Sequence, residues 1–227
     1  MGLDSLSKKQ KFALSLAAPV LIAEPGCDYQ SLAFAAADKV AALLSSQWSI
    51  DNREQLLTKL DWLDTEGGYT IEYLRLHHYL SEMLHLERKD FIASLASGDA
   101  GQFTRASLVA QYLHDLGEHT IRAFDIAGQN VLVRAGYVMG WFEEAETWQR
   151  LTLQADIIVD HGMFKTHFDY LYSYVVGRVF GMMLDHEALM DTLTCIRDLV
   201  NDDDSPYVAF APWPNTDGSS SAVGEGV

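Results

Sequence analysis

The chain has 227 residues, and 48% of them are hydrophobic, which is enough for a sizeable core and argues against a disordered chain. Sixteen Lys and Arg oppose 32 Asp and Glu, so the formal net charge is −16. This charge repels phosphate backbones, which excludes nucleic acid as a favoured partner and favours a basic protein. The two cysteines, Cys27 and Cys195, are too few and too far apart for a disulfide framework and indicate free thiols in a reducing cytoplasm.

The first predicted element follows three lysines and is an apolar run, FALSLAAPVLIA, at residues 12–23. The pattern imitates a signal peptide, but Glu24 and Pro25 stand where a lipobox needs small and apolar residues. The run is also too short to span a membrane. We therefore expect a first core helix, a cytoplasmic protein and no membrane partner, with export as the alternative interpretation.

The middle of the chain is predicted to be helical throughout. No proline occurs between Pro25 and Pro206, and this stretch is rich in Ala, Leu, Glu and Gln. Proline is the strongest helix breaker, so its absence favours helices over strands. The sequence therefore predicts an all-α fold, a single irregular domain of about seven to eight helices over residues 1–200.

Start and stop signals place the individual helices. They predict helices over 51–65, 70–96, 104 to about 117, 119–137, 143–159 and 166–200. Asp51 and Glu54 form a capping-box-like start for the first of these, and Thr104 is the expected cap of the third. Glu143 begins an acidic first turn, which the helix dipole favours.

Residues 201–227 are predicted to form a flexible acidic tail, because Pro, Gly and Ser dominate there. From Leu184 to the end, nine acidic residues accompany one basic residue, Arg197. Two interpretations stay open: a solvated tail that aids solubility, or an acidic arm that docks on a basic partner. The aromatic residues Tyr207, Phe210 and Trp213 could anchor the tail to the domain or to a partner.

Lone charged residues inside apolar helices give the strongest candidate site. Arg134 and Arg178 each lie on an apolar helical stripe, and Asp125 lies in the same helix as Arg134. Buried charges are costly unless they are paired, so one interpretation is an internal ion network in which Asp125 or one of Glu143, Glu144 and Glu146 pairs with the arginines. The other is a pocket for an anionic ligand. The full candidate set is Asp125, Arg134, Tyr137, Glu146, Tyr174 and Arg178.

The sequence contains few motifs that indicate a catalytic, metal or cofactor site. His78, Glu82 and His85 share one helix face, but a dimetal site needs a second such motif and none is found. No GxSxG, HExxH or P-loop is present. An acid/base pair of Asp125 and Glu146 is the catalytic interpretation that survives. We predict no catalytic residue, no metal and no cofactor.

A contact surface is predicted at three aromatic residues. Trp141 and Phe142 fall at an expected corner between two helices, and Trp213 lies in the tail. Aromatic residues at helical spacing usually belong to the core, whereas exposed ones are typical of interfaces.

Several short motifs together identify a family resemblance between about Phe12 and Gly181. They are the opening KFALSLAAPVLIAEPGCDYQSL; Trp48, Ile50, Asp51 and Arg53; Ala123, Phe124, Asp125 and Ile126; Arg134, Gly136, Tyr137 and Gly140; Glu143, Glu144, Ala145 and Trp148; and Tyr174, Gly177 and Arg178. This pattern resembles the bacterial DUF1266 domain family of uncharacterised proteins. Gly128, Thr166, His167 and Gly181 depart from it. The resemblance implies a mostly α fold and implies no reaction.

Two functions from different classes follow. The first is a non-enzymatic interaction protein whose acidic surface binds a basic protein partner, as an immunity protein or inhibitor binds a toxin. The alternative is a binding protein for a small anionic ligand, or an enzyme, that uses the Arg, Asp and Tyr residues between the helices.

Overall fold

The computed structural model describes residues 6–24, 26–64, 68–116, 119–203, 205–207 and 213–214. Within these residues no strand forms, and the elements are α1 (Lys8–Ser15), α2 (Ala18–Leu21), α3 (Ala37–Leu43), a π-helical turn η2 (Leu44–Trp48), α4 (Arg53–Asp64), α5 (Gly68–Ser81), α6 (His85–Leu95), α7 (Ala100–Gln111), α8 (Arg122–Val138), α9 (Glu144–Asp160), α10 (His167–Met182) and α11 (His186–Asn201). The prediction of an all-α fold is confirmed. The helices are more numerous than the seven to eight predicted.

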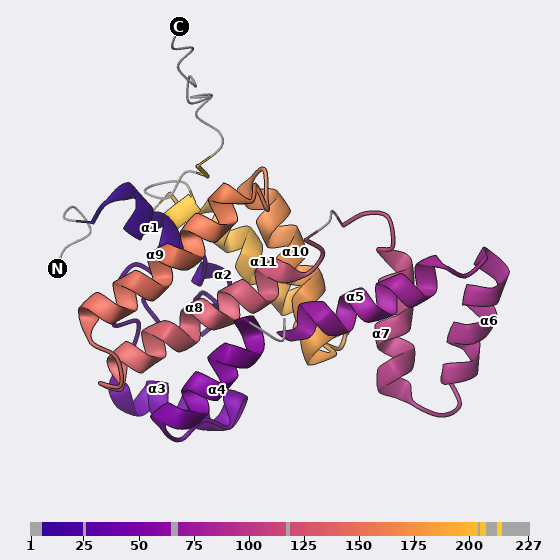
Figure 1. Ribbon diagram of the computed structural model, residues 1–227, viewed down its shortest axis with the longest axis horizontal. Coiled ribbons are helices and arrows are strands. Elements are labelled where there is room, and N and C mark those ends of the chain that lie inside the picture. Colours follow the sequence, from indigo (N-terminus) through magenta and orange to yellow (C-terminus); the bar gives the residue numbers. More distant parts are fainter. Residues whose placement is uncertain are drawn as a thin grey trace, which may run out of the picture.

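Helix α8 is the centre of the molecule. Every residue from 123 to 136 is buried, because α4, α9 and α10 pack around this helix (Figure 1). A helix that is apolar on all sides can be stable only in such a surrounded position. Helices α5, α6 and α7 extend from this body as an arm, and α6 has no buried residue (Figure 1).

Small residues allow the helices around α8 to approach closely. A Cβ atom added to Gly136 would lie 2.4 Å from the ring of Phe142, and one added to Gly177 of α10 would lie 2.5 Å from Cβ of Phe124. Non-bonded carbon atoms cannot approach so closely, so any larger residue at Gly136 or Gly177 would push its neighbours away. The glycines therefore fix the spacing of α8 to its neighbours.

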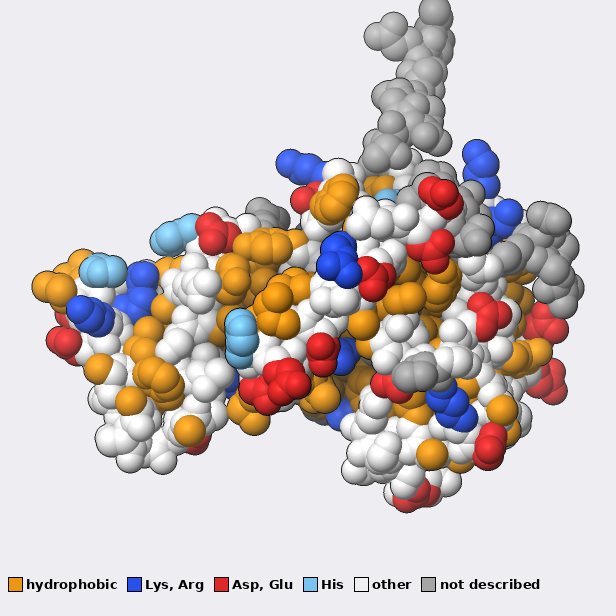
Figure 2. Space-filling view, turned by 180° about the vertical axis from the view of Figure 1, so that it is seen from behind, with side chains coloured by type: hydrophobic (Ala, Val, Ile, Leu, Met, Phe, Trp, Pro, Cys, Tyr) orange, Lys and Arg blue, Asp and Glu red, His pale blue; other side chains and the backbone are white. Residues whose placement is uncertain are grey.

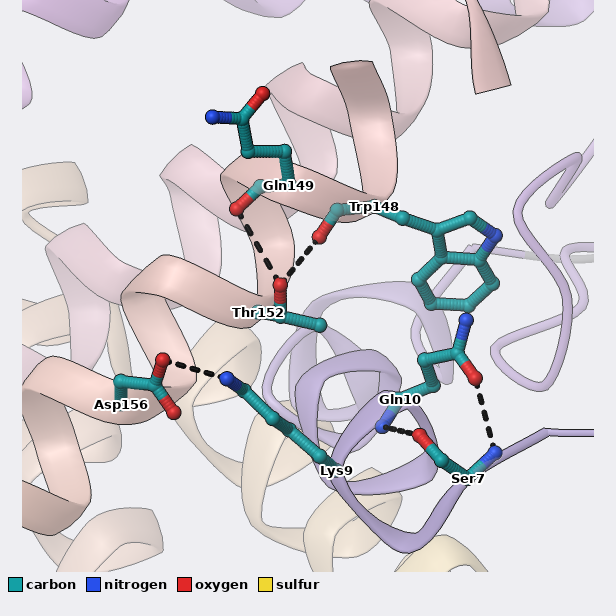
Figure 3. Close-up of polar contacts among 7 residues, drawn as sticks. All are labelled: Ser7, Lys9, Gln10, Trp148, Gln149, Thr152 and Asp156. Carbon is teal, nitrogen blue, oxygen red and sulfur yellow. Dashed lines mark hydrogen bonds and ion pairs between the residues drawn. The ribbon is translucent and has the colours of Figure 1, made fainter. Parts of the chain in front are cut away.

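The N-terminal segment forms core helices. Ser7 and Gln10 make a reciprocal capping box at the start of α1, and Lys9 Nζ lies 2.5 Å from Asp156 Oδ2 of α9 (Figure 3). Phe12 is buried behind these contacts. The helix stops at Ser15, and α2 begins again at Ala18 because Pro19 is suited to a first helical turn.

Two predicted helices are each divided in the structure. The predicted helix 70–96 is α5 and α6, and the predicted helix 166–200 is α10 and α11. In the second case Met183 takes a left-handed conformation with φ of 50°, and the side chain of Asp185 caps Ala188 N at 2.9 Å. Neither break contains proline or glycine, which is why the proline and glycine signals did not predict them.

The C-terminal segment meets the body at two described aromatic residues. Tyr207 Oη donates to Ser15 O over 3.2 Å, and Trp213 Nε1 donates to Phe164 O over 2.7 Å. Both side chains are buried, and Trp213 packs edge-on against Phe12. These contacts agree with the anchoring interpretation of the aromatic residues. Phe210 and most of the predicted tail lie outside the described residues.

Candidate functional site

Asp125 caps a neighbouring helix. Its carboxylate accepts hydrogen bonds from Thr70 N at 2.8 Å, from Thr70 Oγ1 at 2.5 Å and from Tyr69 N at 3.2 Å, all at the start of α5. Burial raises the pKa of Asp125, whereas the bonds from Thr70 and Tyr69 and the charge of Arg122 act in the opposite direction. The carboxylate thus satisfies the free N–H groups of α5.

Arg134 binds backbone oxygens. Its Nη2 donates to Asp28 O at 2.8 Å and to Ser31 O, and its guanidinium lies 5.4 Å from the ring centre of Phe34. The side chain is fully buried, and its Nε and Nη1 have no hydrogen-bond partner among the described residues. Burial lowers the pKa of Arg134, and nearby Asp28 opposes that shift. The residue fastens the segment between α2 and α3 onto α8.

Arg178 has a different environment from Arg134. Its Nη1 donates to Tyr174 Oη at 3.0 Å, and Tyr174 Oη donates to Pro19 O at 3.1 Å. Burial raises the pKa of Tyr174, while the charge of Arg178 lowers it. Tyr137 is half-buried against the core, and its hydroxyl makes no hydrogen bond with a described residue.

Glu146 lies apart from the two arginines. It accepts two hydrogen bonds from Arg150, at 3.1 Å and 2.9 Å, one turn along α9. Among the described residues, neither Arg134 nor Arg178 forms an ion pair. The structure therefore divides the six candidate residues among separate contacts, and their role as one ligand-binding set stays a prediction.

The three aromatic residues of the predicted contact surface differ in exposure. Phe142 and Trp213 are buried within this chain, and the role of the three residues as a contact surface stays a prediction. Phe142 is covered by two cations, with Arg150 at 4.8 Å and Arg53 at 5.7 Å from its ring centre. Only Trp141 is partly accessible.

A groove of about 400 Å³ lies over α8, between α4 and α9. Its apolar lining residues are Leu57, Leu60, Ile126, Val133, Leu153, Ile157, Ile158 and Met163, and its polar ones are Asp61, Asp64, Arg122, Gln129, Arg150 and Gln154. Leu153 is 58% exposed although it is apolar. An apolar hollow with a few placed polar groups is the usual form of a ligand site. None of the six predicted site residues lines this groove.

A second exposed feature lies where α10 meets α11. Met182 and Met183 at the end of α10 and Met190 and Leu193 of α11 are all exposed, and we call these four residues, which share the segment 182–193, the methionine face. Figure 2, a view from behind, shows hydrophobic side chains gathered in the middle of the molecule beside acidic ones. In α11 the buried side chains are Thr192 and Leu199, and Met190 and Leu193 lie outside that buried stripe. The sequence alone did not show this, because it did not predict that a separate helix begins after Met183.

The described residues contain neither a cluster of metal ligands nor a membrane-spanning helix. In the described part of the chain, no group of three or more His, Cys, Asp or Glu side chains could hold a metal ion. His78 Nε2 instead lies 3.3 Å from Glu82 Oε1 on an exposed helix face. No described helix is long and apolar enough to cross a membrane.

Comparison with known proteins gives a family. A family model described as "Protein of unknown function (DUF1266)" matches residues 43–213. Uncharacterized protein YbeU of Escherichia coli (strain K12) is 27% identical over 203 residues, which cover 85% of this chain and 81% of YbeU. Uncharacterized protein YbeR of the same organism is 27% identical over 157 residues, 69% of this chain and 63% of YbeR. No solved structure matches the chain. Because the family model spans most of the chain, as the motifs predicted, this protein belongs to the DUF1266 family.

Proposed function

We propose that this protein is a non-enzymatic interaction protein, and that its methionine face binds a basic amphipathic helix of a protein partner. The observation that carries the proposal is the exposure of four large apolar side chains, Met182, Met183, Met190 and Leu193, within one acidic stretch of the chain.

The apolar part of the proposal rests on exposure. Met190 is 49% exposed and Leu193 is 41% exposed, and their neighbours Met182 and Met183 are exposed to a similar degree. Methionine is flexible and polarisable, so it adapts to the shape of different apolar side chains. Grouped exposed apolar residues on a water-soluble surface typically mark an interaction site. A helix that offers a matching apolar stripe is a suitable occupant.

The charge of the surroundings selects a basic partner. Between residues 185 and 203 the described acidic residues are Asp185, Glu187, Asp191, Asp198, Asp202 and Asp203, and the one Lys or Arg is Arg197. The net charge of −16 for the whole chain acts in the same direction. Complementary charge accelerates association and disfavours acidic partners.

The test is a binding titration with two synthetic helical peptides. One has a leucine stripe flanked by lysines, and the other has glutamate in place of every lysine. We expect only the lysine peptide to bind, and we expect about tenfold weaker binding when NaCl is raised from about 0.05 M to about 0.5 M, because salt screens the charges.

Matched variants locate the binding surface. Met190→Gln with Leu193→Gln should weaken binding of the lysine peptide at least about tenfold, because two apolar contacts are lost. Leu84→Gln with Leu86→Gln on the arm is the control. Both residues are 72% exposed, and both are distant in the sequence from the methionine face. Equal loss in both double variants, or equal binding of the glutamate peptide, would contradict the proposal.

A further inference from the structure

We propose a second binding site, in the groove over α8, for a ligand with a protonated amine at one end of an apolar body and a hydrogen-bond acceptor within it. This chemistry is shared by the amino terminus of an apolar peptide and by a small amphiphilic amine. The inference is independent of the methionine face, since no residue of that face lines the groove.

The shape of the groove suits an elongated apolar body. Arg122 begins α8, and Val133 lies eleven residues later, so the floor extends over about 16 Å. The walls are apolar, and two wall residues, Leu153 and Ile157, are exposed instead of covered. A volume of about 400 Å³ falls within the range of small-ligand sites.

One end of the groove favours a positive charge. Asp61 and Asp64 both line that end, and Arg122 lines it beside them. Arg122 Nη1 already donates to Leu63 O at 3.0 Å, and its Nη2 is 4.0 Å from Asp64, which is a weak contact. Asp64 therefore retains capacity to bind an ammonium group.

Three helix termini lie near this end: the carboxyl ends of α4 and α9 favour a cation, and the amino terminus of α8, which begins at Arg122, opposes them. Asp64 is the last residue of α4, and Asp160 is the last residue of α9, near the lining residues Ile157 and Ile158. The carboxyl end of a helix carries partial negative charge and stabilises a nearby cation. Arg150, towards the other end, is neutralised by its two hydrogen bonds to Glu146.

The floor of the groove offers an unused hydrogen-bond donor. Gln129 is only 7% exposed, and its Oε1 accepts from Gln154 Nε2 at 2.6 Å. Its own Nε2 makes no hydrogen bond with any described residue, although an amide nitrogen carries two donor hydrogens. This donor is accessible from the groove, so a carbonyl oxygen of a ligand would replace water as its acceptor.

The test uses four probes with known charge. Dileucine amide has a free amino terminus, its N-acetylated form is neutral, and N-acetyldileucine is an anion; octylamine has the cation and the apolar chain without a carbonyl. Calorimetry or ligand-observed NMR should show that dileucine amide binds at least about tenfold more tightly than its neutral form. The anion should not bind. Dileucine amide should also bind more tightly than octylamine, which identifies the peptide terminus as the favoured source.

Aspartate variants test whether Asp61 and Asp64 bind the protonated amine of the ligand. Asp61→Asn with Asp64→Asn should weaken dileucine amide about tenfold and leave the neutral probe unchanged. Asp90→Asn with Asp115→Asn changes the net charge equally at two exposed residues, one in α6 and one after α7, and it should have no effect. Met190→Gln with Leu193→Gln should also have no effect, which separates this site from the proposed function.

Variants also test the floor and the wall. Gln129→Leu should reduce the binding of dileucine amide to the level of octylamine. Because this change leaves Gln154 without its partner, Leu153→Gln provides a second test at an exposed position and should weaken every amine. The proposal is overturned if the anion or the neutral probe binds as tightly as the amine, if both aspartate double variants lose binding equally, or if no probe binds at millimolar concentration.

Discussion

Asp125 connects two helices that are distant in the sequence. It lies in α8 and binds the first N–H groups of α5, where Gly68 has φ of 53° and leaves no room for a side chain beside the carboxylate. A carboxylate at the start of a helix is stabilised by the helix dipole as well as by its hydrogen bonds. Asp125 therefore holds the arm against the body, which is a structural role.

Replacing Asp125 by alanine should lower the free energy of unfolding by about 2–4 kcal/mol, because the N–H groups of Tyr69 and Thr70 would lose their acceptor in a buried place. Asp125→Asn keeps one acceptor oxygen and should cost about 1 kcal/mol. Urea denaturation measures both values. An Asp125→Ala protein of unchanged stability would disprove the structural role.

The two arginines show what the sequence could and could not predict at this scale. The apolar stripes predicted that Arg134 lies in the core, and it is fully buried. The partner could not be predicted, because the oxygens that Arg134 binds belong to the backbone at Asp28 and Ser31 and every residue has such an oxygen. We expected a carboxylate partner because a sequence shows which side chains are acidic, whereas it does not show which backbone oxygens come near Arg134.

At the scale of elements, the C-terminal segment is the least expected part of the core. Trp213 is within ring contact of Phe12 in α1, of Phe164 just before α10 and of Tyr170 within α10. The predicted boundary at residue 200 places Trp213 outside the domain and stays a prediction. Burial of an indole among aromatic rings nevertheless contributes as much as any core residue.

Trp213→Ala should lower the free energy of unfolding by about 3–5 kcal/mol, because a large buried side chain is removed from a packed site. Phe168→Ala is the matched control on α10, since this aromatic residue is 72% exposed, and it should change stability by less than about 0.5 kcal/mol. Thermal or urea unfolding measures both. If the two variants behave alike, the contact of Trp213 with the body does not stabilise the fold.

Helix caps explain which boundaries were predictable. The start of α9 at Glu144, after Glu143, and the start of α10 after Thr166 agree with the predicted signals. Asn52 caps Gln55 N instead of Asp51, and Asp99 begins α7 instead of Thr104. Several residues near each start can cap a helix, so the sequence predicts the helix better than its first residue.

For the whole molecule, buried tyrosines set the response to alkali. Burial raises the pKa of Tyr73, Tyr170, Tyr174 and Tyr207 above the usual value of about 10. Above pH 10 these phenols lose protons in the unfolded chain and keep them in the folded one. Their contribution to stability is therefore complete below pH 10 and is lost as the pH rises towards the folded pKa values.

We expect the free energy of unfolding to fall above pH 10 by about 1.4 kcal/mol per pH unit for each such tyrosine. Arg134 acts in the opposite sense, because burial lowers its pKa and the unfolded chain then binds the extra proton. Urea denaturation between pH 8 and about 11.5 measures how steeply the free energy of unfolding falls with pH. Tyr170→Phe should reduce this slope by the contribution of one tyrosine. A stability that does not change with pH over this range would show that these phenols ionise freely.

The distribution of charge is the property of the whole chain that bears most on function. The sequence predicted a basic protein partner from the net charge of −16 alone. Of the three aromatic residues of the predicted contact surface, Phe142 and Trp213 are buried, whereas Met190 and Leu193, which the sequence analysis did not single out, are exposed. The exposure of Met190 and Leu193 depends on where α10 ends and on how α11 packs. The sequence around these two residues does not specify that packing.

Affinity capture from cells of the native host tests the central claim most directly. The full chain, the Met190→Gln with Leu193→Gln variant and the Leu84→Gln with Leu86→Gln variant would be compared at low salt, with quantitative identification of every bound protein. The account predicts one stoichiometric basic partner that is retained by the wild type and by the arm variant, and lost from the methionine-face variant. A stoichiometric partner that is acidic, or that all three proteins retain equally, would contradict it.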